Sequence, residues 1–294
     1  MTNPWLERRV VAYAHQGGAK EAPSSTLYAI ARAVAAGATA VELDVHATKD
    51  RELVVCHDPT VDRTTGSSGA IAARTLAELQ RLDNAYWFVP GHDVRRGGRA
   101  GDYPLRGRAP ADPTLGVATL RAVLEAFPGL VLNLDIKRTA PDVEPYEDIL
   151  ARLLAEHGRS DDVIVASFHD RATAAFHALA PDVAISAGRR AVTSFTLAVW
   201  SRRRPDRDLA RYAALQVPAR VGPKALVTRR YVDVAHGLGV AVHVWTVDEA
   251  EEMERLVALG VDGVISDRPS VLAGVLDRLQ VAWRDAPGTG RAPA

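Results

Sequence analysis

The sequence predicts an α/β protein that forms a single (β/α)8 TIM barrel with an insertion after its second strand. Eight short β-branched runs alternate with amphipathic stretches of helical period, which indicates parallel strands joined by right-handed crossovers. A length of 294 residues suits one barrel of roughly 250 residues with added segments. Because no G-x-G-x-x-G turn follows the first run, a doubly wound dinucleotide-binding sheet is disfavoured.

The predicted strands are short and largely apolar, as expected of barrel strands covered on both faces. In order they are Val10–Ala14, Ala40–Val45, Leu130–Ile136, Val163–Ala166, Val183–Ser186, Ala214–Val217, Val240–Trp245 and Gly263–Ser266. The helices predicted between them place apolar residues three or four positions apart. These are Ser25–Ala36, Thr119–Phe127, Pro145–His157, Arg171–Leu179, Thr228–Leu238, Asp248–Leu259 and Pro269–Leu279.

The alternation is interrupted over residues 53–113, which we interpret as the insertion. It begins with an extra strand at Leu53–Cys56, continues with a short helix at Thr75–Leu82 and carries the aromatic run Tyr86, Trp87 and Phe88. Its second half is rich in Gly and Arg and has little periodicity, which predicts a mobile loop or flap. We expect one domain over residues 1–282 and a disordered tail over 283–294.

Composition excludes several classes of protein. Hydrophobic residues at 47% and charged residues at 24% are typical of a globular protein with a sizeable core. The 36 basic and 36 acidic residues cancel, so the net charge predicts no bulk attraction to nucleic acid or anionic membrane. The single Cys56 cannot form an internal disulfide, and neither a signal peptide nor a transmembrane segment is apparent, so we expect a cytoplasmic protein. The oligomeric state stays open.

Polar residues gather where the predicted strands end. The carboxyl ends of barrel strands meet at one mouth, so these side chains are expected to converge there. The period of two along a strand puts Glu42 and Asp44 on one face, with Val41 and Leu43 on the opposite, helix-packed face. The residues at or just beyond the strand ends are His15, Glu42, Asp44, Asp135, Lys137, Ser167, Trp245 and Asp267.

Three of these residues, Glu42, Asp44 and Asp135, are carboxylates that would share one small mouth. Such a group repels itself and raises each pKa unless a cation lies among its members. Oxygen donors without Cys or His at zinc spacing favour a divalent ion such as Mg²⁺ or Ca²⁺. The alternative is that arginines pair with these carboxylates and close the top of the barrel.

Two histidines are suited to acid–base chemistry. Among the nine histidines, His15 in AHQGG and His57 in CHDPT lie at strand ends next to small or turn-forming residues. A pair of imidazoles titrating near neutral pH can divide the work of a general acid and a general base. Lys137 beside the carboxylates calls for an anion such as phosphate. For His243 a packing role inside the barrel is favoured.

Several ordered blocks resemble a known family. The stretch from VVAYAHQGG to CHDPTVDRTT, followed by LNLDIK, ASF, HVWTVD and GVDGVISDRP, is similar to the glycerophosphodiester phosphodiesterases over about Val10 to Leu279. The resemblance implies a barrel, a divalent metal, and hydrolysis that releases an alcohol and sn-glycerol 3-phosphate. It further implies catalytic roles for His15, His57 and Lys137, and metal binding by Glu42, Asp44 and Asp135.

The sequence departs from the family pattern at three places. Asp135 replaces the usual Glu, giving a DIK variant that resembles a branch acting on lysophospholipids. Gln16 replaces the Arg of the HRG block, and Ser24 and Ser25 replace Glu and Asn of the PENT block. Trp245 matches the family tryptophan that lies against the glycerol, although a core role is the alternative. Ser167 and Phe168 are expected to be walls of the site.

The loss of an arginine at position 16 removes a bidentate phosphate contact. Lys20 or an arginine of the insertion is expected to supply the missing positive charge. We predict that Arg106 or Arg108, on the flap, contacts the substrate phosphate when substrate arrives.

Three functions follow from these residues. The first is metal-dependent hydrolysis of glycerophosphodiesters. The second is lysophospholipase D activity, in which Tyr86, Trp87 and Phe88 cover an acyl chain, although these aromatics also suit the interior of the insertion. The third is a non-catalytic phosphate-binding barrel, which the departures at Gln16, Ser24 and Asp135 motivate.

Overall fold

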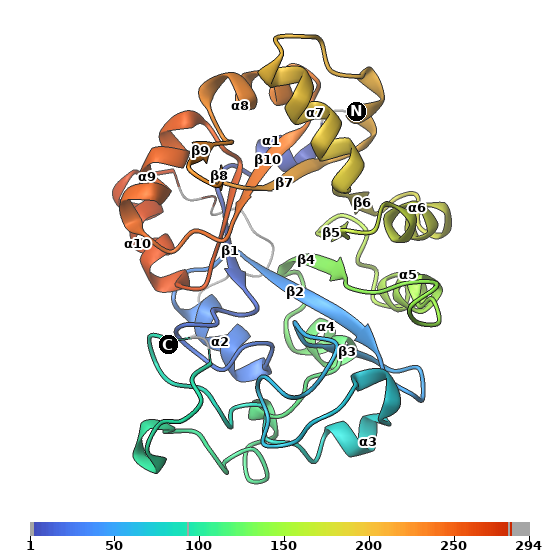
Figure 1. Ribbon diagram of the computed structural model, residues 1–294, viewed down its shortest axis with the longest axis vertical. Helices are drawn as coiled ribbons and strands as arrows, with labels where there is room; N and C mark the ends of the chain where they lie inside the picture. Colours follow the sequence, from blue (N-terminus) through green and yellow to red (C-terminus); the bar gives the residue numbers. More distant parts are fainter. Residues whose placement is uncertain (1–2, 93, 282, 284–294) are drawn as a thin grey trace.

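The computed structural model describes residues 3–92, 94–281 and 283, and within them the chain forms a barrel of eight parallel strands surrounded by helices (Figure 1). Neighbouring strands run in the order β6-β5-β4-β2-β1-β11-β10-β7. The predicted (β/α)8 class is therefore confirmed. The barrel strands are β1 (Val11–His15), β2 (Ala40–Ala47), β4 (Val131–Ile136), β5 (Val163–Ala166), β6 (Ala184–Ile185), β7 (Ala214–Pro218), β10 (Ala241–Trp245) and β11 (Gly263–Ser266).

The helices mostly begin where the sequence predicts. Thr26, Thr119 and Thr228 each precede a helix, and the hydroxyl of each accepts a hydrogen bond from a backbone N–H of the first turn. The α-helices outside the insertion are α1 (Pro4–Glu7), α2 (Leu27–Ala35), α4 (Leu120–Ala126), α5 (Glu147–Glu156), α6 (Asp170–Leu179), α7 (Arg189–Trp200), α8 (Arg229–His236), α9 (Ala250–Leu259) and α10 (Pro269–Arg278). None of the described helices combines the length and the apolar character needed to cross a membrane.

Helix α7, between β6 and β7, is absent from the predicted elements. It buries Phe195 and Val199 against the barrel. Four β-branched residues, including Thr193 and Thr196, weaken the helical signal of this segment, so that tertiary packing decides its structure. The short 3-10 helix η4 (Arg207–Arg211) and the hairpin of β8 (Arg220–Val221) with β9 (Lys224–Ala225) are further elements that the sequence did not predict.

The ring of strands closes at a narrow seam between β6 and β7. Strand β6 has two residues, and one parallel bridge joins Ser186 to Ala214. Backbone hydrogen bonds of 2.9 Å from Ala187 to Ala214 and from Ala213 to Ile185 support it. By contrast, β2 and β4 pair in register over six residues, from Ala40 with Val131 to Val45 with Ile136.

Side chains alternate between the barrel interior and the helices. Val41, Leu43 and Val45 pack in the large apolar cluster between strands and helices, as predicted. Ala40 joins a second apolar cluster at the amino-terminal end of the barrel interior, together with Tyr13. In α1, Trp5 is 1% exposed and closes this end. Glu42 and Asp44 continue the inward face of β2 toward the opposite end, which is the mouth.

The insertion follows β2, as predicted, and lies beside the mouth (Figure 1). The predicted extra strand is β3, which pairs antiparallel with β2 from Val45 with Val55 to Ala47 with Leu53. Two small apolar clusters form its interior. Its other elements are η1 (Ile71–Ala73), α3 (Leu76–Leu79), η2 (Ala100–Asp102) and η3 (Pro113–Leu115). Residues 284–294 of the predicted disordered tail lie outside the described residues.

Candidate active site

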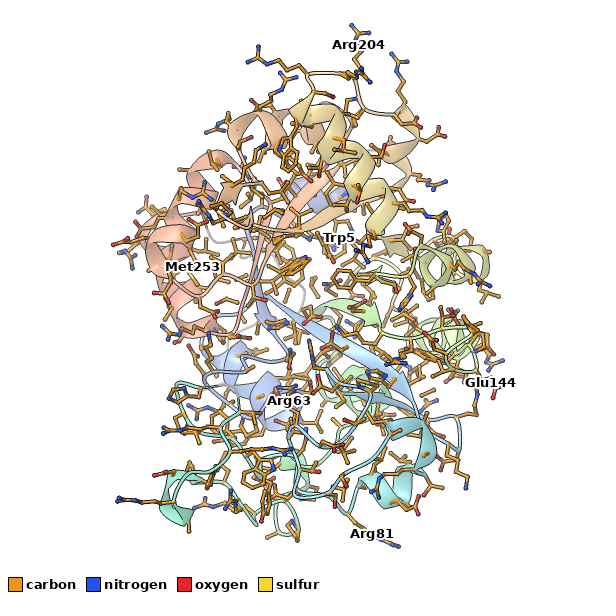
Figure 2. All side chains as sticks on the ribbon, in the orientation of Figure 1. Trp5, Arg63, Arg81, Glu144, Arg204 and Met253 are labelled. Carbon is orange, nitrogen blue, oxygen red and sulfur yellow. The ribbon has the colours of Figure 1, made fainter. Side chains whose placement is uncertain are left out.

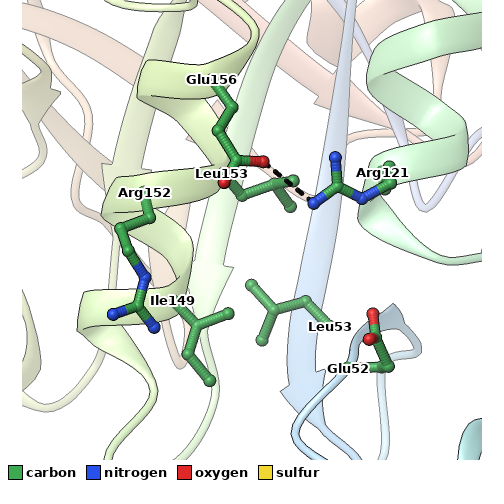
Figure 3. A pocket seen from close by; sticks show the side chains of 7 residues that line it. All are labelled: Glu52, Leu53, Arg121, Ile149, Arg152, Leu153 and Glu156. Atoms are coloured by element: carbon green, nitrogen blue, oxygen red, sulfur yellow. Dashed lines mark hydrogen bonds and ion pairs between the residues drawn. The ribbon is translucent and has the colours of Figure 1, made fainter.

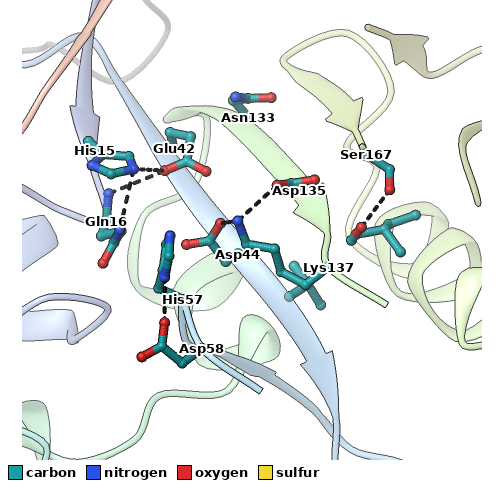
Figure 4. A network of polar contacts seen from close by, with 12 residues as sticks. His15, Gln16, Glu42, Asp44, His57, Asp58, Asn133, Asp135, Lys137 and Ser167 are labelled. Atoms are coloured by element: carbon teal, nitrogen blue, oxygen red, sulfur yellow. Dashed lines mark hydrogen bonds and ion pairs between the residues drawn. The ribbon is translucent and has the colours of Figure 1, made fainter. Parts of the chain in front are cut away.

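The strand register brings the predicted acidic residues and His15 to one level of the barrel. His15 on β1 is the register partner of Glu42 on β2, and Asp44 is the partner of Asp135 on β4. Figure 4 shows these side chains at the mouth, with His57 approaching from the insertion. Glu42, Asp44 and Asp135 are 6%, 1% and 7% exposed, so their charges face a largely dry environment.

Lys137 neutralises part of this charge. Its ammonium Nζ lies 2.7 Å from Asp44 Oδ1 and 3.1 Å from Asp135 Oδ2, between the two carboxylates (Figure 4). Burial acts to lower the pKa of Lys137, but the neighbouring Asp135 and Asp44 outweigh it and raise the pKa. The alternative prediction was that arginines pair with these carboxylates. For Asp44 and Asp135 the partner is this lysine instead.

The negative charge of the acidic residues is only partly compensated by Lys137. Asp44 Oδ2 and Asp135 Oδ1 are buried without a hydrogen-bond partner. Burial and the nearby Asp44 raise the pKa of Glu42 to about 8, and burial also raises the pKa of Asp135. The donor chemistry and the two orphaned oxygens therefore fit a hard divalent cation. Across the described residues no three metal-ligating side chains are already drawn together, so an ion would have to bring these carboxylates closer.

His15 is held by acidic groups at both ring nitrogens. Its Nδ1 lies 2.6 Å from Asp267 Oδ1, and its Nε2 lies 3.6 Å from Glu42 Oε2. Burial acts to lower the pKa of His15, but the hydrogen bond with Asp267 and the charge of Glu42 raise it to about 9. The Gln16 amide nitrogen lies 3.3 Å from the same Nε2. That contact suits the neutral ring, whereas the carboxylates suit the charged ring, so both states of a proton-transfer group have partners.

His57 is held in a similar way from the insertion. Its Nδ1 lies 2.6 Å from Asp58 Oδ1, and its ring centre is 6.4 Å from that of His15. With Nδ1 engaged, Nε2 is left for proton transfer. Asp58 was not singled out from the sequence, although its place directly after His57 in CHDPT was a usable signal.

Arg63 is a second residue that the sequence analysis missed. Its Nε donates to Asp58 Oδ2 at 3.0 Å, and one Nη donates to Gln16 Oε1 at 3.1 Å. Gln16 therefore has an arginine beside it, supplied by the start of the insertion. A usable signal was the proximity of this arginine to His57 in HDPTVDR, whereas the prediction relied on the density of arginines in the flap.

The turn that carries Gln16 is tightly constrained. Gln16 has a φ of 52°, and its backbone N–H donates to Glu42 O at 2.9 Å. Gly17 follows with a φ of 82°, and a Cβ there would lie 2.9 Å from the Ala29 side chain, so glycine is required. Ser24 and Ser25 are buried with unpaired hydroxyls, where larger side chains would need space.

The flap arginines occupy other surroundings. The guanidinium of Arg106 lies 3.5 Å from the ring centre of Tyr103, 4.3 Å from that of Tyr86 and 4.7 Å from that of Trp87. It also donates to the Tyr86 carbonyl at 2.9 Å. Arg108 is exposed. A phosphate contact by either residue stays a prediction, and for Arg106 it would require this packing to break.

The same packing bears on the aromatic run. Tyr86 and Trp87 surround Arg106, and Phe88 is 5% exposed. These side chains form part of the interior of the insertion, the structural alternative given for them above. At the mouth, Phe168 is 57% exposed, and its ring meets that of Trp245 edge-on at 5.9 Å.

Two other predicted residues have structural partners. Ser167 Oγ donates to the Ile136 carbonyl at 2.6 Å and accepts from the His169 N–H, so its hydroxyl is engaged by the backbone. Lys20, proposed as a substitute cation, lies 2.6 Å from Asp248.

A small pocket between α4, α5 and β3 has the Arg121–Glu156 ion pair on its rim and contains no predicted site residue (Figure 3).

Comparison with known proteins decides the family. The family model for glycerophosphoryl diester phosphodiesterases matches residues 15–271. The chain belongs to this glycerophosphoryl diester phosphodiesterase family. It is 32% identical over 270 residues to the probable glycerophosphodiester phosphodiesterase 2 of Mycobacterium tuberculosis, covering 90% of each chain. It is 30% identical over 262 residues to the putative glycerophosphodiester phosphodiesterase YhdW of Bacillus subtilis, covering 88% of this chain and 95% of the relative.

Solved structures of the glycerophosphoryl diester phosphodiesterase family share the fold. The glycerophosphoryl diester phosphodiesterase domain of a Mycobacterium tuberculosis protein aligns with a TM-score of 0.75 at 22% identity, over 92% of this chain and 99% of that one. A phosphodiesterase of Oleispira antarctica, solved with the product sn-glycerol-3-phosphate, aligns with a TM-score of 0.69 at 23% identity, over 93% and 99%. The resemblance read from the sequence motifs is therefore confirmed.

Proposed function

We propose that this protein hydrolyses glycerophosphodiesters, such as glycerophosphocholine, to an alcohol and sn-glycerol 3-phosphate. The observation that carries the proposal is the pair of imidazoles at the mouth, His15 and His57, with ring centres 6.4 Å apart. Each has its Nδ1 held 2.6 Å from a carboxylate oxygen. This arrangement orients two proton-transfer groups toward one reacting centre, next to a cluster of charges suited to a phosphate.

In the proposed reaction, an oxygen nucleophile forms a bond to phosphorus and the bond from phosphorus to the alcohol oxygen breaks. One imidazole accepts the proton of the attacking oxygen, and the other donates a proton to the departing oxygen. Asp267 and Asp58 keep the rings oriented and stabilise the charged form of each. The nucleophile is either water or the 2-hydroxyl of the substrate. Attack by the 2-hydroxyl would first give a cyclic phosphate, in which water then attacks phosphorus and breaks the bond to the 2-oxygen.

Glu42, Asp44 and Asp135 would hold the divalent metal, Mg²⁺ or Ca²⁺. When bound, such an ion supplies Lewis-acid stabilisation of the phosphoryl oxygens. Lys137, paired with Asp44 and Asp135, adds positive charge at the same place and is the residue proposed to face the developing negative charge on the phosphate. Trp245 is proposed to cover the glycerol, since it lies half-buried at the mouth.

The alternatives make different demands. Lysophospholipase D activity would need an acyl-chain surface, and the aromatics suggested for it surround Arg106 instead. A non-catalytic phosphate-binding barrel would not need two oriented imidazoles.

We further propose a cytoplasmic location, on the ground that the chain has one cysteine, which is buried.

Activity of the purified protein on glycerophosphocholine and on lysophosphatidylcholine tests the proposal, with and without added Mg²⁺ or Ca²⁺. We expect metal-dependent release of choline from the first substrate, and a loss of kcat of about 10²–10⁴-fold in His15→Ala or His57→Ala. The exposed His169→Ala is the matched control. Activity within threefold of wild type in either site variant would refute the catalytic assignment. Phosphate binding without turnover would favour the non-catalytic barrel.

A further inference from the structure

Two contacts of Arg63 point in different directions. It lies in the insertion, and its side chain is 21% exposed. One face of the guanidinium donates to Asp58 Oδ2 at 3.0 Å, and another N–H donates to Gln16 Oε1 at 3.1 Å. Arginine presents five donors in a rigid planar fork, so one guanidinium can hold both partners at defined angles at the same time.

Each partner of Arg63 in turn contacts one of the two imidazoles. Asp58 Oδ1 lies 2.6 Å from His57 Nδ1, while its Oδ2 faces Arg63. Gln16 Nε2 lies 3.3 Å from His15 Nε2, while its Oε1 faces Arg63. The contacts thus form a continuous path from one ring to the other that passes through a single guanidinium.

The chemistry of the groups gives this path a direction. A guanidinium only donates hydrogen bonds, so it can engage only the oxygen of the Gln16 amide, and this turns the NH₂ group toward His15. In the same way, Arg63 holds one carboxylate oxygen of Asp58, which leaves the other to orient the His57 ring. Without Arg63 both side chains would be able to rotate, and neither imidazole edge would keep its present partner.

Arg63 also joins two parts of the chain that lie far apart in the sequence. Gln16 follows β1 of the barrel, whereas Asp58 and His57 belong to the insertion after β3. Because the two rings are carried on different segments, contacts between the segments fix their relative position. That position matters, since a displacement of about 1 Å is enough to lower a rate about 100-fold. The contact of Arg63 with Gln16 is a contact of this kind.

We propose that Arg63 is a positioning residue that sets the relative placement of His15 and His57 by holding Gln16 and Asp58. This inference rests on the proposed function, because the placement matters for proton transfer to and from one substrate. In this role Arg63 acts through Gln16 and Asp58 and not by contacting the substrate. The placement of the rings is nevertheless a property of the protein alone, so it can be measured without substrate.

Kinetics of Arg63→Met and Arg63→Lys, with Arg204→Met at an exposed arginine away from the site as control (Figure 2), test the proposal. We expect kcat to fall by about 10–100-fold in both Arg63 variants and KM to change by less than about threefold, because a lysine cannot hold both partners. Arg204→Met should match wild type. A rise in KM with kcat unchanged would overturn the proposal, since it would indicate direct binding of the substrate. Retention of kcat within threefold in Arg63→Met would do the same.

Two double-mutant cycles examine the path itself. Arg63→Met combined with Asp58→Asn, and Arg63→Met combined with Gln16→Ala, should each lose less activity than the product of the single losses, because the paired residues act as a unit. Multiplicative losses in both cycles would contradict a route through these partners.

A measurement independent of turnover separates this inference from the proposed function. In the folded protein, the imidazole ¹⁵N signals of both His15 and His57 should move in Arg63→Met and stay in place in Arg204→Met, with circular dichroism confirming that each variant is folded. Unmoved signals would overturn the positioning role. If the signals move but the wild-type protein turns over no phosphodiester, the positioning role stands and the proposed function fails.

Discussion

His15 and Asp267, at the ends of the neighbouring strands β1 and β11, are joined by a contact of 2.6 Å between the ring Nδ1 and a carboxylate oxygen. Together with Glu42, this contact offsets burial and raises the pKa of His15 to about 9. In Asp267→Asn, burial opposes the charged ring with less compensation, so we expect the pKa of His15 to fall by about one unit or more. Titration of the ring by NMR in metal-free protein measures this. Glu251→Gln, an acid-to-amide change at an exposed position, is the control, and an unchanged pKa in Asp267→Asn would contradict the prediction.

Metal binding should release protons. Burial and Asp44 raise the pKa of Glu42 to about 8, so this carboxyl is largely protonated at pH 7 in the metal-free protein. A divalent cation requires the carboxylate form, so we expect release of about one proton at pH 7 when Mg²⁺ or Ca²⁺ binds. Calorimetry in two buffers of different ionisation enthalpy gives the number. Glu42→Gln should abolish the release, and binding by the wild type without proton release would count against Glu42 as a ligand.

Replacing Arg106 and Arg108 by alanine distinguishes two roles for the flap. Arg106→Ala removes a guanidinium that lies among three aromatic rings, so we expect a loss of about 1–2 kcal/mol in the free energy of unfolding, measured with urea. Arg108→Ala should leave stability unchanged. If Arg106 contacts the substrate phosphate, kcat/KM will fall by tenfold or more while stability stays near that of the wild type.

Stability should decrease in mild acid because of His243. Burial lowers the pKa of this fully buried ring to about 4, against 6.5 in the unfolded chain, and Asp262 offsets this only in part. The unfolded state therefore binds the extra proton first. The contribution is present above pH 6.5 and is lost, at about 1.4 kcal/mol for each pH unit, as the pH falls toward 4. Denaturant unfolding at several pH values measures the slope, which His243→Leu should reduce and the exposed His169→Leu should not.

The barrel and the acidic part of the site were predictable because both depend on local periodicity. The period of two in β2 placed Glu42 and Asp44 on the inward face, and the strand order then brought Asp135 beside them. Helix α7 was missed because its β-branched residues weaken the helical signal, and packing of Phe195 outweighs that weakness. Local rules describe regular elements well and say little about segments whose structure depends on distant contacts.

The arginine near Gln16 illustrates the same limit. Composition drew attention to the flap, where arginines are dense, but Arg106 is engaged by Tyr86, Trp87 and Tyr103. Arg63 reaches Gln16 instead, across 47 positions of sequence. Which of several arginines reaches a distant partner depends on the path of the insertion, and no periodic pattern encodes that path.

The narrow seam between β6 and β7 is the place where we expect the ring of strands to open locally. Phe168 follows β5 and Trp245 ends β10. Their edge-on ring contact therefore spans the seam between β6 and β7 at the mouth. We expect opening of this seam to separate the two rings as well. Amide protons at Ser186 and Ala187 will exchange with solvent sooner than those in the six-residue pairing of β2 with β4. We therefore expect the mouth to be more mobile beside Trp245 than where β2 pairs with β4.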